Sequence, residues 1–145
     1  MGMFSLMGLD ISPTLKSIPF LKDAPGRALR AAGKEATLFS LPAGWTLFEK
    51  GEPANAIYFV LSGTLGAFRH SLDGRMEMLS IIRSGEPVGE MALFSGGPET
   101  VNPPRSASVY ALRDTEILKL SRAGFDKLIK ADPYILQRLI RVILH

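Results

Sequence analysis

Two charged residues of opposite sign lie at the ends of a glycine- and proline-rich stretch in the second half of the chain. Gly89-Glu90 opens this stretch and Arg105-Ser106-Ala107 closes it. A glycine lets backbone N–H groups come close to an anion, and the first turn of a helix adds unpaired donors and the positive end of its dipole. An arginine fork matches two phosphate oxygens, whereas a carboxylate can accept hydroxyl groups. The spacing therefore suits a small anion that also carries hydroxyls.

The same stretch resembles the phosphate-binding cassette of cyclic-nucleotide-binding domains. The pattern of that family is an apolar residue, Gly-Glu, a variable residue, a small residue, an apolar residue, a variable loop and then Arg-Ser/Thr-Ala. The sequence matches this pattern from Val88 to Leu93 and again at residues 105–107, which Val109 and Ala111 follow.

A second family pattern precedes the cassette, and two separated patterns in the right order are more specific than one glycine-rich loop. It consists of Gly51, Glu52, Ala54, the apolar residues 57–60 and Gly63. The segment departs from the family at Phe48, where a smaller β-branched residue or cysteine is usual. The resemblance covers residues from Thr37 to the C-terminus and implies an eight-stranded antiparallel jelly roll.

The resemblance also implies a role for each ligand-binding residue. Arg105 would pair with a cyclic phosphate and Glu90 would accept the ribose 2′-hydroxyl, while the cassette backbone would supply further donors. The complete predicted set is Ser80, Gly89, Glu90, Met91, Ala92, Arg105, Ser106 and Ala107. Purely structural roles are the alternatives: a carboxylate-paired arginine, a glutamate at a helix N-terminus and a strand serine at position 80.

Composition narrows the function classes. Hydrophobic residues make up 46% of the 145 residues and charged residues 21%, which is typical of a folded domain. The absence of cysteine excludes disulfides and thiolate metal sites, and it fits a cytoplasmic location. His70 and His145 are the only histidines, too few for a jelly-roll metal centre. We expect no catalytic residue, no metal and no cofactor other than the ligand itself, so the chain is not predicted to be an enzyme.

The hydrophobic pattern predicts mainly β structure with flanking helices. Short strands are expected at 36–41, 46–49, 56–62, 65–71, 76–83, 106–111 and 116–120, separated by turn residues. Asp73-Gly74 predicts a two-residue hairpin turn. Ser12 is expected to cap a first helix that begins at Pro13. Ser121 is expected to cap a later helix, and Asp132-Pro133 separates that helix from the last one.

These boundaries define three parts of the chain. Residues 1–34 form an N-terminal helical segment, residues 35–120 the β-roll with its cassette at 88–111, and residues 121–145 the C-terminal helices. The last helix is expected to run from Tyr134 to His145, and its segment Tyr134–Leu144 has more apolar positions than one contact face requires. We expect the chain to precede an effector domain that it does not contain.

Two functional hypotheses follow. The first is a regulatory domain that binds cAMP, with cGMP left open, and signals through its C-terminal helices to an effector: a transcription regulator, a channel or a patatin-like phospholipase. The second is a jelly-roll interaction module that has lost nucleotide binding and forms a homodimer through Tyr134–Leu144; the long loop Phe94–Pro104 is its main support. No direct contact with nucleic acid is expected from this chain.

Overall fold

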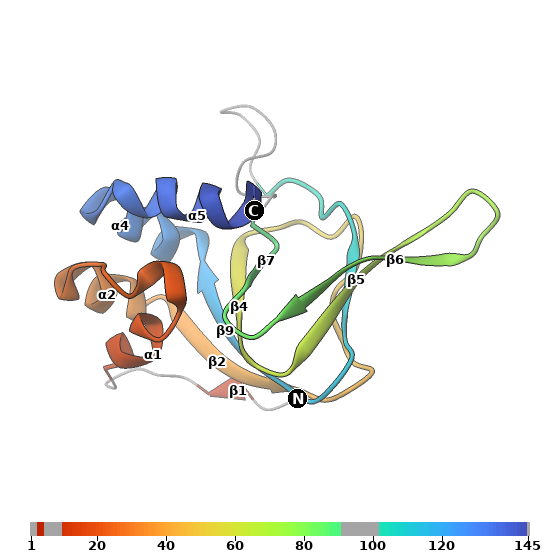
Figure 1. The fold of residues 1–145 in the computed structure, drawn as a ribbon, viewed down its shortest axis with the longest axis horizontal. Helices are drawn as coiled ribbons and strands as arrows, with labels where there is room; N and C mark the ends of the chain where they lie inside the picture. Colours follow the sequence, from red (N-terminus) through yellow and green to blue (C-terminus); the bar gives the residue numbers. More distant parts are fainter. Residues whose placement is uncertain (1–2, 5–9, 91–101, 145) are drawn as a thin grey trace.

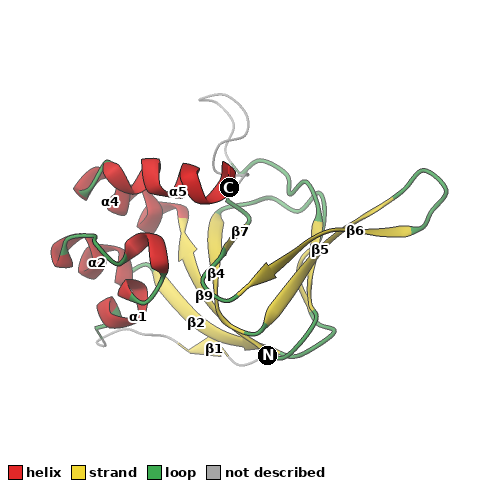
Figure 2. Ribbon diagram, in the orientation of Figure 1, coloured by secondary structure: helices red, strands yellow, loops and turns green. Residues whose placement is uncertain are grey.

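Short strands joined by tight turns form two antiparallel sheets in the computed structural model, which describes residues 3–4, 10–90 and 102–144. The first sheet has the strand order β1-β2-β9-β4-β7, and the second has the order β3-β8-β5-β6. The strands are β1 (Met3–Phe4), β2 (Ala36–Leu41), β3 (Thr46–Phe48), β4 (Ala56–Ser62), β5 (Thr64–His70), β6 (Met76–Arg83), β7 (Pro87–Val88), β8 (Ser108–Ala111) and β9 (Thr115–Ser121). This is the jelly-roll arrangement with helices that the sequence predicts (Figure 2).

The helices gather on one side of the roll, away from the projecting β5–β6 hairpin (Figure 1). They are α1 (Ser12–Lys16), the 3-10 helix η1 (Pro19–Leu21), α2 (Gly26–Gly33), α4 (Arg122–Ala131) and α5 (Tyr134–Leu144). Helices from both ends of the chain therefore form one layer, which covers the first sheet.

Strand β4 faces two separate hydrophobic clusters because successive side chains of a strand point to opposite sides. Ile57 and Phe59 pack with the helices in one cluster, whereas Val60 packs between the two sheets in the other. The strand thus connects the helical layer with the interior of the roll. Its nearly continuous apolar sequence is explained by burial on both faces.

Three of the predicted strands have the expected bounds, and the differences elsewhere are local. The two-residue strands β1 and β7 were not predicted, because so short a segment carries no readable period. The β5–β6 connection is longer than a two-residue turn: it spans residues 71–75, with Ser71 N–H donating to the Arg75 carbonyl at 2.7 Å. Gly74 still adopts the positive φ, +84°, that the turn requires.

The helix ends also follow the sequence in part. Ser121 caps α4 as predicted, since its hydroxyl accepts the Gly124 N–H at 3.1 Å. Ser12 does not cap α1; it is the first residue of that helix, and Asp10 accepts its backbone N–H at 2.9 Å. The start of the N-terminal helix is therefore shifted by one residue from the predicted position.

Candidate functional site

A cavity of about 240 Å³ opens between the two sheets at the point where β7 leads into the predicted cassette. Apolar residues from β3, β6, β7 and β8 form most of its wall, and Glu90, Arg105, Ser80 and Ser106 contribute polar groups. The lining residues are Phe48, Ala67, Leu79, Ser80, Ile82, Pro87, Val88, Gly89, Glu90, Pro104, Arg105, Ser106, Ala107 and Val109. A concave, mainly apolar hollow with a few polar groups is the usual form of a small-molecule site.

Backbone pairing fixes the main chain of Arg105. Its N–H donates to the Glu52 carbonyl at 2.8 Å, and its own carbonyl accepts the Gly51 N–H at 2.8 Å. An isolated bridge between Pro53 and Pro104 continues this pairing. The two motifs of the sequence therefore meet in space, and the Gly51-Glu52 segment holds the arginine of the cassette in place.

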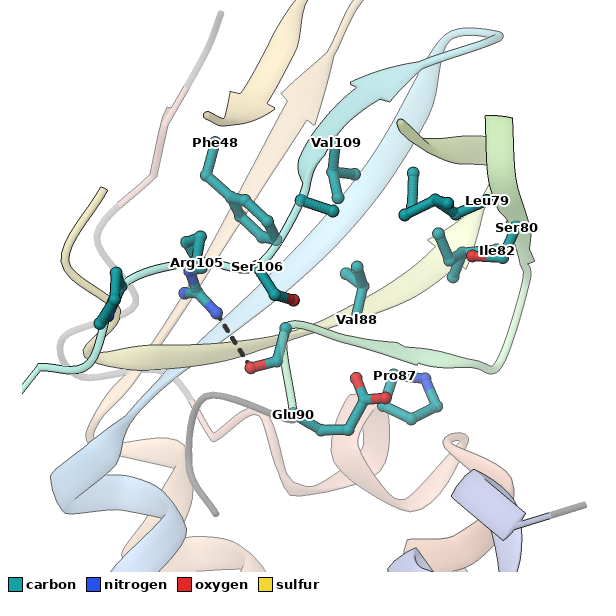
Figure 3. Close-up of a pocket in the computed structure, with 14 residues that line it drawn as sticks. Phe48, Leu79, Ser80, Ile82, Pro87, Val88, Glu90, Arg105, Ser106 and Val109 are labelled. Atoms are coloured by element: carbon teal, nitrogen blue, oxygen red, sulfur yellow. Dashed lines mark hydrogen bonds between the residues drawn. The ribbon is translucent and has the colours of Figure 1, made fainter. Parts of the chain in front are cut away.

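Arg105 as a residue is only 5% exposed, and its guanidinium donates hydrogen bonds to two backbone carbonyls. Nη1 donates to Gly89 O at 2.9 Å and Nη2 donates to Ala56 O at 2.9 Å, as the dashed line to Gly89 in Figure 3 illustrates. These contacts use two of the five N–H groups of a guanidinium. Burial lowers the pKa of Arg105, while Tyr58, Glu52 and Glu90 act in the opposite direction.

Two aromatic rings flank the same guanidinium. The Cζ atom of Arg105 lies 4.2 Å from the centre of the Phe48 ring and 5.6 Å from that of Tyr58. The two rings also contact each other, with centroids 5.9 Å apart. A cation over an aromatic face within about 6 Å is attracted by the ring quadrupole.

Gly89 shows why the cassette opens with glycine. Its φ is +80°, a conformation that L side chains rarely adopt, and a Cβ atom there would collide with Nη1 of Arg105. The glycine therefore serves both the turn and the close approach of the arginine to the Gly89 carbonyl.

Glu90 also lines the cavity, at a different part of the wall from Arg105 (Figure 3). Burial raises the pKa of its carboxyl group, and the nearby charge of Arg105 lowers it in part. A partly desolvated carboxylate of this kind gains from a hydroxyl that donates to it. The two charged groups chosen from the sequence thus line one hollow.

The remaining predicted residues divide into two groups. Ser80 lies on the opposite side of the cavity from Arg105, while Ser106 and Ala107 follow the arginine directly (Figure 3). Met91 and Ala92 lie outside the described residues, as does most of the loop Phe94–Pro104. The predicted roles of all these residues toward a ligand stay predictions.

The structure adds site residues that sequence reasoning missed. In the sequence, Phe48 is a departure from the family pattern, Tyr58 is one of the apolar residues 57–60 of that pattern, and Ala56 is the start of a predicted strand. No local signal marks a backbone carbonyl such as Ala56 O as an arginine acceptor. The replacement of a small residue by phenylalanine was the one available clue to the aromatic contact.

Among the described residues 3–4, 10–90 and 102–144, no group of three or more histidine, aspartate or glutamate residues could hold a metal ion. Within the same residues, no helix is long and apolar enough to cross a membrane.

Comparison with known proteins agrees with this geometry. The family model described as "Cyclic nucleotide-binding domain" matches residues 38–132. The chain is 37% identical over 98 residues to the cyclic AMP receptor protein of Thermus thermophilus, which covers 68% of this chain and 43% of that protein. It is also 33% identical over 101 residues to a lysophospholipase of Aspergillus terreus, covering 70% of this chain and 6% of the enzyme.

A solved structure supports the same class. The catabolite activator protein of Thermus thermophilus superposes with a TM-score of 0.72 and 29% sequence identity, over 87% of this chain and 56% of that one. The fold and the family match together place the chain in a class of regulatory domains. The chain belongs to the cyclic nucleotide-binding domain family. It spans less than half the length of the curated relatives named above.

Proposed function

We propose that this domain binds cAMP in the cavity and passes the binding event through its C-terminal helices to an effector domain or a second subunit. The observation that carries the proposal is that Arg105 and Glu90 line one partly open hollow. Arg105 would bind the cyclic phosphate and Glu90 the ribose 2′-hydroxyl, leaving the apolar wall for the base. Ser80, on the far side of the cavity, would approach that base.

A short backbone route supports transmission from the cavity to the helices. Arg105 bonds to the carbonyl of Ala56, and the neighbouring carbonyl, that of Asn55, accepts the N–H of Arg122 at 2.8 Å. Arg122 is the first residue of α4. A phosphate that draws Arg105 toward the cavity would therefore pull on Ala56. The next residue, Asn55, is hydrogen-bonded to the first residue of the C-terminal helices.

The last helix is held by a second arginine. Arg138 of α5 donates to the carbonyl of Phe20 at 3.0 Å and to the carboxylate of Asp132 at 2.9 Å. Exposed apolar residues on the same helix, Tyr134, Ile140 and Val142, supply a surface for a partner. We propose this helix as the output. Curated relatives that include a cAMP-activated transcriptional regulator and a lysophospholipase suggest a transcription regulator or a phospholipase as the effector class.

One observation favours the alternative of a ligand-free interaction module. The guanidinium of Arg105 is already hydrogen-bonded to two carbonyls and covered by Phe48, so a structural role would also satisfy it. In that case the chain would associate through α5 without binding nucleotide.

Calorimetric titration with cAMP and with cGMP separates the two functions. We expect cAMP binding that is lost in Arg105→Lys and Glu90→Ala but kept in the matched control Arg113→Lys, an exposed arginine outside the cavity. Heat release with neither nucleotide, together with an unchanged melting temperature, would favour the interaction module. Sedimentation at high concentration then tests association through α5.

A further inference from the structure

Resting on the function proposed above, we propose that Phe48 is a positioning residue for the phosphate contact. Its ring holds the guanidinium plane of Arg105 so that the remaining N–H donors face the cavity. Phe48 thereby sets the affinity for the anionic part of the ligand, although it offers the ligand no hydrogen bond of its own.

The backbone of β3 directs Phe48 to this position. The pairing of β3 with β8 shifts register between Thr46 and Phe48, and a shift of this kind re-aims a side chain. Phe48 pairs with Val109, lines the cavity and is 6% exposed. Figure 3 shows its ring beside the Arg105 side chain on the same side of the hollow.

In the proposed arrangement the ring contacts a part of arginine that a phosphate does not need. All five N–H groups of a guanidinium lie in its plane, so a ring stacked on that plane would leave the in-plane donors available. The carbonyls of Gly89 and Ala56 fix two points of that plane. The centroid of the Phe48 ring is 4.2 Å from Cζ, and this contact opposes rotation of the guanidinium about the line between the two carbonyl oxygens.

The size of the effect follows from the burial of the pair. Cation–π contacts contribute most where water is excluded, and in such sites they correspond to roughly a 10- to 30-fold change in an equilibrium constant. An aliphatic residue of similar size would fill the space without offering a negative face. A smaller residue, as the family usually has here, would leave the arginine plane without this contact.

Stepwise fluorination of the Phe48 ring tests the proposal with little change of shape. Fluorine withdraws electron density from the ring face, so we expect cAMP affinity measured by calorimetry to fall with each added fluorine, by roughly 10-fold or more for the trifluoro ring. Phe48→Leu should weaken binding similarly. Phe39 is the matched control: it is 3% exposed and contacts Tyr58 edge-on, but it does not line the cavity. Fluorinated Phe39 and Phe39→Leu should bind cAMP as the unaltered domain does.

A second readout works without ligand. The Arg105 side-chain Nε–H resonance, assigned by its loss in Arg105→Lys, should be displaced by the Phe48 ring and should move on fluorination at Phe48 but not at Phe39. Equal cAMP affinity across the fluorinated Phe48 series would overturn the proposal. If the unaltered domain binds no cyclic nucleotide, the proposed function fails, and an Nε–H resonance unmoved in Phe48→Leu would overturn the positioning role separately.

Discussion

Replacing Gly89 with alanine tests the contact between the cassette turn and Arg105, and a matched glycine allows its parts to be separated. Gly89 and Gly74 have nearly equal positive φ angles, +80° and +84°. A Cβ atom at Gly89 would collide with Nη1 of Arg105, whereas a Cβ atom at Gly74 would have no neighbour within 4 Å. The two substitutions therefore share backbone strain and differ in the collision.

The magnitudes can be worked out for each variant. An L residue in the left-handed region costs roughly 1–2 kcal/mol, which is the whole effect expected for Gly74→Ala. Displacement of Nη1 also weakens the charged hydrogen bond to Gly89 O, which contributes roughly 1.5–3 kcal/mol. Gly89→Ala should therefore lower the free energy of unfolding by roughly 2.5–5 kcal/mol.

Urea unfolding, monitored by circular dichroism, measures the loss of stability in each variant, and calorimetric titration of the native variants measures their cAMP affinity. We expect Gly89→Ala to weaken cAMP binding about tenfold or more, because the arginine fork is displaced, and Gly74→Ala to leave binding unchanged. Equal losses of stability in the two variants, with unchanged cAMP binding in both, would refute the close contact on which this reasoning depends.

Three further predictions address the other groups of the site and the output helix. Burial raises the pKa of the Glu90 carboxyl group in the folded protein. The protonated carboxyl therefore contributes to the free energy of unfolding at low pH, and this contribution is lost as pH rises through the raised pKa. The proposed function assigns the ribose hydroxyl to the Glu90 carboxylate, so cAMP affinity should fall as pH decreases through the same range. Glu90→Gln should show no such dependence in a calorimetric pH series, and an identical pH profile in the variant would contradict the assignment. Arg138→Leu removes the hydrogen bonds to Phe20 and Asp132, so it should lower the free energy of unfolding by roughly 1–3 kcal/mol. It should also raise the rate of amide hydrogen exchange in α5, and an unchanged rate there would argue against α5 being held by this arginine. Ser80→Ala should weaken cAMP binding by roughly tenfold or less, as expected for one neutral hydrogen bond, and no change at all would assign Ser80 to the strand alone.

Much of the fold was predictable because its strands are separated by strong turn signals. The bounds of β2, β4 and β6 follow from apolar runs between glycine, proline and asparagine residues. The helix break at Asp132-Pro133 was equally clear, since proline cannot continue a helix. Strand β7 was hidden, because Pro87 and Val88 belong to the cassette pattern and form only two residues of sheet.

Of the residues around the cavity, the charged ones were predictable from the sequence, whereas those that hold Arg105 in place were not. Arg105 and Glu90 stand in a recognisable pattern, and their placement around one cavity agrees with it. The groups that hold Arg105 come from elsewhere: Ala56 through a carbonyl that its side chain does not reveal, and Phe48 through a register shift. Such contacts depend on tertiary packing, so a linear pattern carries no record of them.

The most direct test is a crystal structure of the domain grown with cAMP. We predict electron density for the cyclic nucleotide in the cavity, with phosphate oxygens about 2.7–2.9 Å from the Arg105 guanidinium and the ribose 2′-hydroxyl on the Glu90 carboxylate. A cavity left empty at saturating cAMP, with Arg105 still bonded only to the carbonyls of Gly89 and Ala56, would contradict the assignment of this hollow as the nucleotide site.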